Sequence, residues 1–253
     1  MENNNIIVRL ATADDKHYAS TITLEMEESA KARGTGIAKR SPEYIEMKME
    51  EGKAVIAVTS DGTWVGFCYI EAWQHEKYVA NSGLIVSPAF RKSGVATDIK
   101  RKIFELSRKK YPEAKIFGLT TGLAVMKINS DLGYEPVTYS ELTTDEEFWK
   151  GCRSCVNFEI LMSKNRTNCM CTAMLFDPAE AAAKIQAAQL VKSQTVVTVD
   201  GTLKRKRRFK GNFKLFERWV KFKQYVLLRS RNKNNGSGTN ESKKNSILSF
   251  FFW

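Results

Sequence analysis

The segment FRKSGVA (90–96) places two cations and a glycine between an apolar run and a helical pattern. The run ending LIVSP (84–88) predicts a buried strand, and apolar residues recur at helical spacing through TDIKRKIFELSRKK (97–110). Such a turn leaves the first N–H groups of the helix without partners, beside the positive end of the helix dipole. The sequence therefore predicts an anion site that favours phosphate, and a plain basic surface turn is the alternative.

Predicted strands and helices alternate around this turn. Asp61-Gly62 is a turn pair that accepts positive φ, and the β-branched and aromatic runs on either side of it predict a hairpin over 54–73. Further strands are expected at 6–12, 78–88, 114–121 and 134–139. Helices are expected at 14–33, 42–51, 95–110 and 123–133. This order predicts an α/β fold, a mixed central sheet with helices on its faces.

The charge of the chain is unevenly distributed. The formal net charge is +12, yet residues 1–179 hold 23 basic and 24 acidic residues, whereas residues 180–253 hold 17 basic and 4 acidic ones. No stretch approaches the roughly 20 apolar residues of a membrane helix. MENNNIIVRL lacks the basic and apolar regions of a secretory signal, so a cytoplasmic protein is expected.

The run 84–135 resembles the core of the GCN5-related N-acetyltransferase (GNAT) superfamily, the acyl-CoA transferases. The resemblance lies in LIVSPAFRKSGVA, the helix after it, KIFGLTT and VMKINSDLGYEPV. The family pattern Arg/Gln-x-x-Gly-x-Gly/Ala is met by Arg91, Gly94 and Ala96. The order of elements fits this family over residues 6–140, which implies the GNAT-type fold.

The resemblance implies acetyl-CoA or succinyl-CoA as co-substrate. Backbone N–H groups of the turn would bind the pyrophosphate, the strand edge would pair with the pantetheine arm, and Asn129 would contact pantetheine or thiol. The implied cofactor-binding residues are Leu84, Ile85, Val86, Arg91, Lys92, Ser93, Gly94, Val95, Ala96 and Asn129.

The catalytic residues of the family are matched only in part. Many members carry a glutamate on the strand before the phosphate turn, and VANSGLIV has none; Glu71 and His75 are the candidates for the base. Many members use a tyrosine as acid where this sequence has Asn129, which leaves Tyr134 and Tyr139 as further candidates. A solvent-facing glutamate and a surface histidine are the alternatives for Glu71 and His75.

The acceptor is expected near the loop between the first two helices. RGTGIAKR (33–40) contains Arg33, Lys39 and Arg40, and the planar fork of arginine suits a carboxylate. An acidic small-molecule amine is therefore the expected acceptor, and a solvated basic loop is the alternative. Succinyl as the acyl group would need a further cation near the thioester, for which Lys127 is a candidate.

Four cysteines form two close pairs, Cys152 and Cys155, then Cys169 and Cys171. Four thiolates in this spacing suit a tetrahedral structural zinc site, and residues 156–168 between the pairs could form a strand and turn. Reduced structural cysteines, a redox pair and an iron–sulfur cluster are the alternatives. Cys68 is expected in the core.

The sequence divides into three parts: a GNAT acyl-CoA-binding core (1–143), a cysteine-rich extension completing the domain (144–178) and a basic, partly helical tail with a disordered linker (179–253). A helix is expected at 179–192. The tail interleaves cations with aromatics, so nucleic-acid binding is the alternative of another class, although packing or homo-oligomerisation is favoured.

GTGIAKRSPEYI, FWKGCRSC and CTAMLFDP resemble a bacterial subgroup of the superfamily associated with arginine biosynthesis. That resemblance implies acylation of the α-amino group of glutamate. A GNAT enzyme that acts on another small-molecule or protein amine is the alternative within the same family.

Overall fold

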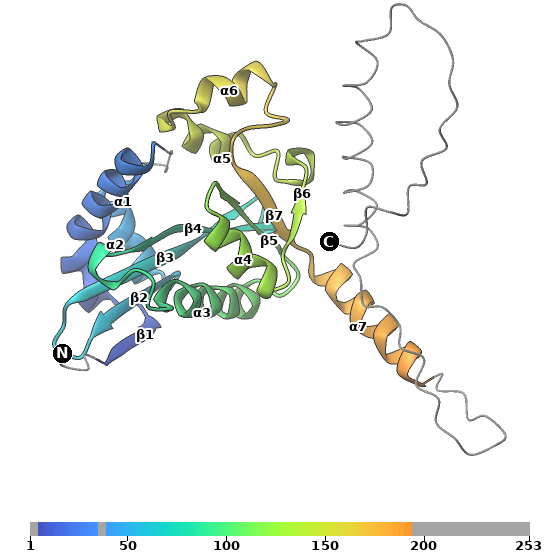
Figure 1. The fold of residues 1–253 in the computed structure, drawn as a ribbon, viewed down its shortest axis with the longest axis horizontal. Helices are drawn as coiled ribbons and strands as arrows, with labels where there is room; N and C mark the ends of the chain where they lie inside the picture. Colours follow the sequence, from blue (N-terminus) through green and yellow to red (C-terminus); the bar gives the residue numbers. More distant parts are fainter. Residues whose placement is uncertain (1–4, 35–38, 194–253) are drawn as a thin grey trace, which may run out of the picture. The chain divides into compact units, whose positions relative to one another are not determined.

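The computed structural model describes residues 5–34 and 39–193 of the chain. It contains one mixed sheet of seven strands in the order β1-β2-β3-β4-β5-β7-β6 (Figure 1). The strands are β1 (Ile6–Leu10), β2 (Ala54–Thr59), β3 (Trp64–Trp73), β4 (Tyr78–Val86), β5 (Lys115–Thr120), β6 (Glu135–Val137) and β7 (Thr172–Phe176). The predicted α/β fold with flanking helices is confirmed.

Helices connect the strands and flank the sheet. The α-helices are α1 (Ala19–Arg33), α2 (Pro42–Glu50), α3 (Val95–Lys110), α4 (Leu123–Asp131), α5 (Glu146–Lys150), α6 (Phe158–Ser163) and α7 (Pro178–Ser193). Four 3-10 helices are η1 (Ala13–Tyr18), η2 (Pro88–Phe90), η3 (Tyr139–Glu141) and η4 (Gly151–Ser154). The first predicted helix therefore divides at Tyr18 into a 3-10 turn and an α-helix.

The two faces of the sheet bury different helices. Successive side chains of a strand point to opposite faces, so Val55 and Cys68 pack with α3 in one apolar cluster. Ile56 and Phe67, next to them in sequence, pack with α1 and α2 in another. The helix that follows the predicted phosphate turn, α3, therefore covers one face of the sheet, and α1 and α2 cover the other (Figure 1).

The strands β4 and β5 diverge near the middle of the sheet. They pair in parallel only where Tyr78–Ala80 meets residues 115–117, although both strands continue beyond. The register between β3 and β4 also shifts at Gly83, because Phe67 pairs with Ile85 but Tyr69 pairs with Ser82. Gly83 has a φ of +66°, and a Cβ added to it would lie 2.2 Å from the Tyr69 ring. Such a bulge bends a strand and redirects its backbone groups, which opens space between β4 and β5.

The cysteine-bearing segment contributes an interior strand. β7 pairs antiparallel with both β5 and β6, so it lies between two strands that precede it in the chain. Residues 158–163 form α6, and the predicted strand and turn between the cysteine pairs is therefore wrong. Leu161 of α6 and Trp149 of α5 pack with Phe117 of β5 in a third apolar cluster.

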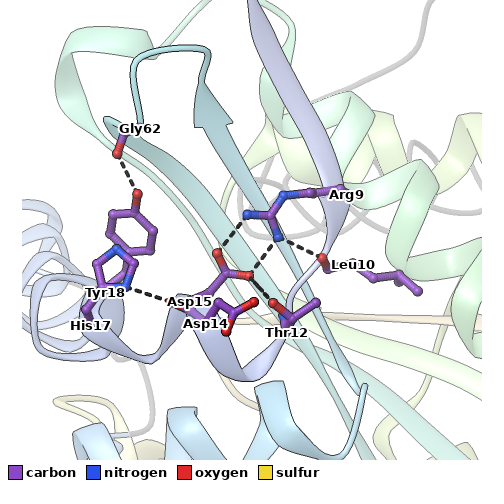
Figure 2. Close-up of polar contacts among 8 residues, drawn as sticks. All are labelled: Arg9, Leu10, Thr12, Asp14, Asp15, His17, Tyr18 and Gly62. Atoms are coloured by element: carbon purple, nitrogen blue, oxygen red, sulfur yellow. Dashed lines mark hydrogen bonds and ion pairs between the residues drawn. The ribbon is translucent and has the colours of Figure 1, made fainter.

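The buried carboxylate of Asp15 joins β1 to the residues that follow it (Figure 2). Asp15 accepts hydrogen bonds from both terminal nitrogens of Arg9, at 2.7 and 2.8 Å, and from the N–H of Thr12 at 2.8 Å. Burial alone would raise the pKa of Asp15, but these hydrogen bonds outweigh it and hold the pKa below its usual value. The Tyr18 hydroxyl donates to the Gly62 carbonyl and fixes the same region to the β2–β3 turn.

We expect Asp15→Asn to lower the free energy of unfolding by about 1–3 kcal/mol at neutral pH, because Arg9 and the Thr12 N–H lose a charged acceptor. The folded-state pKa of Asp15 lies below its unfolded value, so its stabilisation is present above the unfolded pKa of about 3.9 and is lost as the pH falls through the folded pKa. Urea unfolding from acid to neutral pH measures this. The exposed neighbour variant Asp14→Asn is the control, and equal losses in both variants would contradict the account.

None of the helices within residues 5–34 and 39–193 is long and apolar enough to span a membrane. The helix predicted at 179–192 is confirmed as α7. The rest of the predicted basic tail and part of the predicted acceptor loop, residues 35–38, lie outside the described residues.

Candidate active site

A cavity of about 440 Å³ opens where β4 and β5 diverge. This volume is typical of small-ligand sites. The cavity brings together most of the side chains predicted for binding and catalysis. Its walls include, from that predicted set, Arg33, Arg40, Glu71, Leu84, Ile85, Val86, Arg91, Ala96, Asn129, Cys152, Cys155 and Cys171.

The turn before α3 offers a row of free donors. Arg91 and Ala96 at its two ends line the cavity, and the predicted residues between them, 92–95, do not. Gly94 caps α3 with φ +91°, and no protein atom lies within 4 Å of where its Cβ would be. Within the described residues, the backbone N–H groups from Lys92 to Ala96 have no hydrogen-bond acceptor. Free N–H groups at the positive end of a helix suit a phosphate ligand. The residues present therefore fit the pyrophosphate of CoA through their backbone.

Two side chains of the turn, those of Arg91 and Ser93, form hydrogen bonds within the protein. Arg91 donates from Nε to the Val86 carbonyl at 3.0 Å, and from Nη2 to Glu25 at 2.8 Å and Ser29 at 2.6 Å. Ser93 donates its hydroxyl to the Phe90 carbonyl. Arg91 thus fixes the turn to β4 and α1, which the sequence pattern did not reveal.

A buried polar group lies on the other face of the sheet. Glu71 is 5% exposed, and its Oε1 accepts from the Tyr44 hydroxyl at 2.6 Å and from Arg40 Nη2 at 3.0 Å. No described residue donates to the second oxygen, Oε2. Burial raises the pKa of Tyr44, and the Glu71 carboxylate raises it further, so the phenol stays protonated and donates.

Two arginines line the cavity, and one of them, Arg40, pairs with Glu71. Arg40 Nε is buried and has no acceptor within the described residues. Arg33 makes no ion pair in the described part of the chain, and burial together with the nearby Arg91 lowers its pKa. An anion that enters the cavity from this side would compensate Arg40 Nε and the Arg33 charge.

His75 and Lys39, predicted for the base and for the acceptor, do not line the cavity. His75 is exposed in the β3–β4 turn with φ +53° and does not line the cavity. Lys39 points elsewhere, since its ammonium pairs with Glu27 at 3.2 Å. Glu71 is therefore the predicted base candidate that the structure brings to the cavity, and His75 is not.

The candidates for the catalytic acid differ in whether they line the cavity. Asn129 is 1% exposed and lines the cavity, and its Oδ1 has no donor among the described residues. Tyr134 is buried outside the cavity lining and accepts from Asn81. The Tyr139 hydroxyl donates to the Cys171 carbonyl at 2.9 Å. Lys127 is exposed and pairs with Asp131, so it is not the cation near the thioester.

Lys100 lines the cavity and was missed in the sequence. It lies within the basic stretch IKRKIF, where a lysine is normally solvated. The helix turns it inward, and the residue is 2% exposed. Its spacing could have predicted this burial, because Lys100 follows Ala96 by four residues and so lies on the face of α3 that meets the sheet.

The predicted zinc site is not supported. Across residues 5–34 and 39–193, which include all four cysteines of the two pairs, no three His, Cys, Asp or Glu side chains are arranged to hold a metal. The thiols are neighbours nonetheless: burial raises the pKa of Cys171 to about 12, and the other three cysteines raise it in the same direction. The helix α6 between the pairs differs from the strand and turn on which the zinc prediction depended.

In comparison with known proteins, residues 21–124 of the chain match the acetyltransferase (GNAT) family. No curated protein matches the chain. Among solved structures, the chain is similar to N-acetylglutamate synthase from Neisseria gonorrhoeae complexed with coenzyme A and N-acetyl-glutamate, at 17% identity and a TM-score of 0.48. That similarity covers 70% of this chain and 36% of the synthase, so the chain spans only part of the synthase's length.

Two further solved structures are similar to the chain. A Mycobacterium tuberculosis protein in complex with CoA is 16% identical, with a TM-score of 0.48 and coverage of 68% of this chain and 98% of that one. A phosphinothricin acetyltransferase from Sinorhizobium meliloti in complex with AcCoA is 15% identical, with a TM-score of 0.46 and coverage of 68% and 88%. Similarity at this level does not identify an acceptor.

Proposed function

We propose that the protein is an acyl-CoA-dependent N-acyltransferase that moves an acyl group from acyl-CoA to the α-amino group of L-glutamate, a step of arginine biosynthesis. The match of residues 21–124 to the acetyltransferase (GNAT) family supports the enzyme class. The observation that carries the acceptor is the buried Nε of Arg40, which has no acceptor among the described residues, in a cavity that Arg33 also lines. A dicarboxylic amine supplies carboxylates for this side of the cavity.

In this proposal the donor, acyl-CoA, binds along β4 and at the turn before α3. The N–H groups from Lys92 to Ala96 hold the pyrophosphate, and the edge of β4 from Leu84 to Val86 pairs with the pantetheine arm. The thioester then lies in the cavity between β4 and β5. Asn129 lines that part of the cavity and contacts the thioester end.

The reaction proceeds by direct attack of the amine. Glu71 accepts a proton from the substrate ammonium at Oε2, while Tyr44 and Arg40 hold its other oxygen. The amine nitrogen then attacks the thioester carbonyl and forms the C–N bond. When the C–S bond breaks, the nitrogen loses its extra proton, the thiolate gains a proton, and CoA leaves as the free thiol. A backbone N–H at the β4 bulge around Gly83 stabilises the oxyanion that forms at the carbonyl.

The remaining expectations accompany this proposal. The division at residues 143 and 178, the cytoplasmic location and homo-oligomerisation stay predictions. The proposed function includes both acetyl-CoA and succinyl-CoA as donors.

Acceptor specificity tests the proposal. Thiol release from acetyl-CoA and succinyl-CoA is measured with glutamate, glutamine, 4-aminobutyrate and a lysine-containing peptide. Turnover that requires both the α-amino group and the carboxylates of glutamate is expected. Turnover with the peptide but not with glutamate would keep the enzyme class and refute the acceptor.

Arg40→Lys tests the carboxylate contact directly. Lysine keeps the charge opposite Glu71 but loses the Nε donor and the planar fork, so we expect KM for glutamate to rise about 10- to 100-fold. KM for acyl-CoA should stay within about twofold, as judged by steady-state kinetics. Arg101→Lys, an exposed change on α3, is the matched control. An unchanged glutamate KM in Arg40→Lys would remove Arg40 from the acceptor site.

A further inference from the structure

Lys100 is a buried cation that the mechanism above does not use. It is 2% exposed, and within the described residues it forms no ion pair and no hydrogen bond. Its Nζ lies over the Tyr134 ring, 5.4 Å from the ring centroid. The surrounding α3 positions, Ile99 and Ile103, belong to the apolar core. Lys100 is therefore a charge placed in a hydrophobic wall of the cavity.

An unpaired ammonium in such a wall is unfavourable unless an anion compensates it. Burial lowers the pKa of Lys100, and the neighbouring Cys68 thiol raises it only in part. A second polar group in the same cavity is also uncompensated, since Asn129 Oδ1 has no donor and Asn129 Nδ2 contacts only the Met174 sulfur at 3.7 Å. Two buried, poorly satisfied polar groups at one cavity indicate a polar ligand there.

The position of Lys100 restricts which anion this can be. The acceptor carboxylates belong with Arg40, which lies beside Tyr69 on the face of the sheet that α1 and α2 cover. Lys100 extends from α3 on the opposite face, beside Cys68. The pyrophosphate belongs at the start of α3, and Lys100 lies one helical turn beyond Ala96, about 6 Å further along the helix axis. The remaining part of the donor is its thioester end.

We propose that Lys100 binds a carboxylate at the far end of the donor's acyl group, so that the preferred donor is a dicarboxylic acyl-CoA of the succinyl-CoA class. The proposal rests on the proposed acyl transfer and names its donor. Asn129 contributes a second polar contact to the same end of the donor. Acetyl-CoA, which lacks this carboxylate, leaves the Lys100 charge uncompensated.

Binding in the absence of acceptor tests the proposal. Isothermal titration calorimetry of the full chain compares succinyl-CoA with acetyl-CoA, for wild type and for Lys100→Met. Wild type is expected to bind succinyl-CoA about 10- to 100-fold more tightly than acetyl-CoA, and Lys100→Met is expected to abolish that difference. Lys100→Met should melt at the same temperature as wild type or higher, because methionine suits an apolar wall.

Two further variants separate charge from folding. Lys102→Met makes the same change at an exposed position of α3 and should leave both affinities unchanged. Lys100→Arg keeps the charge and should retain part of the preference for succinyl-CoA. Equal affinity of wild type for the two thioesters, or a preference that survives in Lys100→Met, would overturn the assignment.

Turnover distinguishes this proposal from its premise. In Lys100→Met, kcat/KM with succinyl-CoA should fall about 10- to 100-fold, while kcat/KM with acetyl-CoA stays within about twofold. Equal losses with both donors would assign Lys100 to the leaving thiolate and overturn the carboxylate site. If glutamate fails as acceptor while wild type still prefers succinyl-CoA in the binding experiment, the proposed function fails and the donor assignment stands.

Discussion

Gly94→Val is expected to lower the affinity for CoA about 100-fold or more. Gly94 has φ +91°, a conformation that β-branched side chains rarely adopt, and its missing Cβ leaves open space beside the free N–H groups of residues 92–96. Valine would displace those donors and occupy the space through which phosphate approaches. Each lost hydrogen bond to a charged group is worth about 1.5–3 kcal/mol, so two losses account for the effect. Isothermal titration calorimetry with CoA measures it.

Gly62→Val is the matched control for this substitution. Gly62 has a similar φ of +86° but lies in the β2–β3 turn, not in the turn before α3. Both variants should lose comparable stability in thermal melts, while only Gly94→Val loses CoA affinity. Wild-type CoA affinity in a folded Gly94→Val protein would show that the turn does not bind the pyrophosphate.

Glu71→Gln is expected to lower kcat/KM by about 10²- to 10⁴-fold, the usual contribution of a positioned base. Glutamine keeps the shape of the side chain and can still accept from Tyr44 and Arg40, but it cannot take a proton. In the variant, activity should keep rising with pH, because free amine then has to form in solution. The pH profile of kcat/KM in wild type and variant measures the difference.

Two observations check that this loss is chemical. CoA affinity should be unchanged in Glu71→Gln, because the described partners of Glu71 are Tyr44 and Arg40 and none lies in the phosphate turn. Glu76→Gln, an exposed change in the β3–β4 turn, should leave kcat/KM unaltered. A Glu71→Gln protein that keeps the wild-type pH profile and shows only a raised KM for the amine would make Glu71 a support for Arg40 rather than the base.

Local patterns predicted the elements whose information lies within a few residues of sequence. The hairpin around Asp61-Gly62 and the helix α3 combine strong periodicity with clear turn residues, and both are present. The strand β7 was missed because five residues, TAMLF, are too short for periodicity to distinguish. Its place between β5 and β6 depends on contacts across the chain that no local pattern contains.

In the candidate site, too, local sequence patterns predicted some features, and contacts between distant residues determined others. The phosphate turn was predictable because strand, glycine turn and helix are consecutive. The pairing of Arg91 with Glu25 joins residues 66 positions apart, and the burial of Lys100 depends on how α3 packs on the sheet. The Arg40 contact with Glu71 likewise crosses from a loop to β3, so the sequence named both residues without revealing that they meet.

The most direct test of the central claim is identification of the product formed from acyl-CoA and glutamate by the full chain. Mass spectrometry and NMR spectroscopy of the reaction mixture are expected to find one new amide on the α-amino nitrogen, formed in equal amount to free CoA. The same amide should be absent when glutamate or protein is omitted. Release of CoA without an N-acylated glutamate, or no release from protein that binds CoA, would contradict the account.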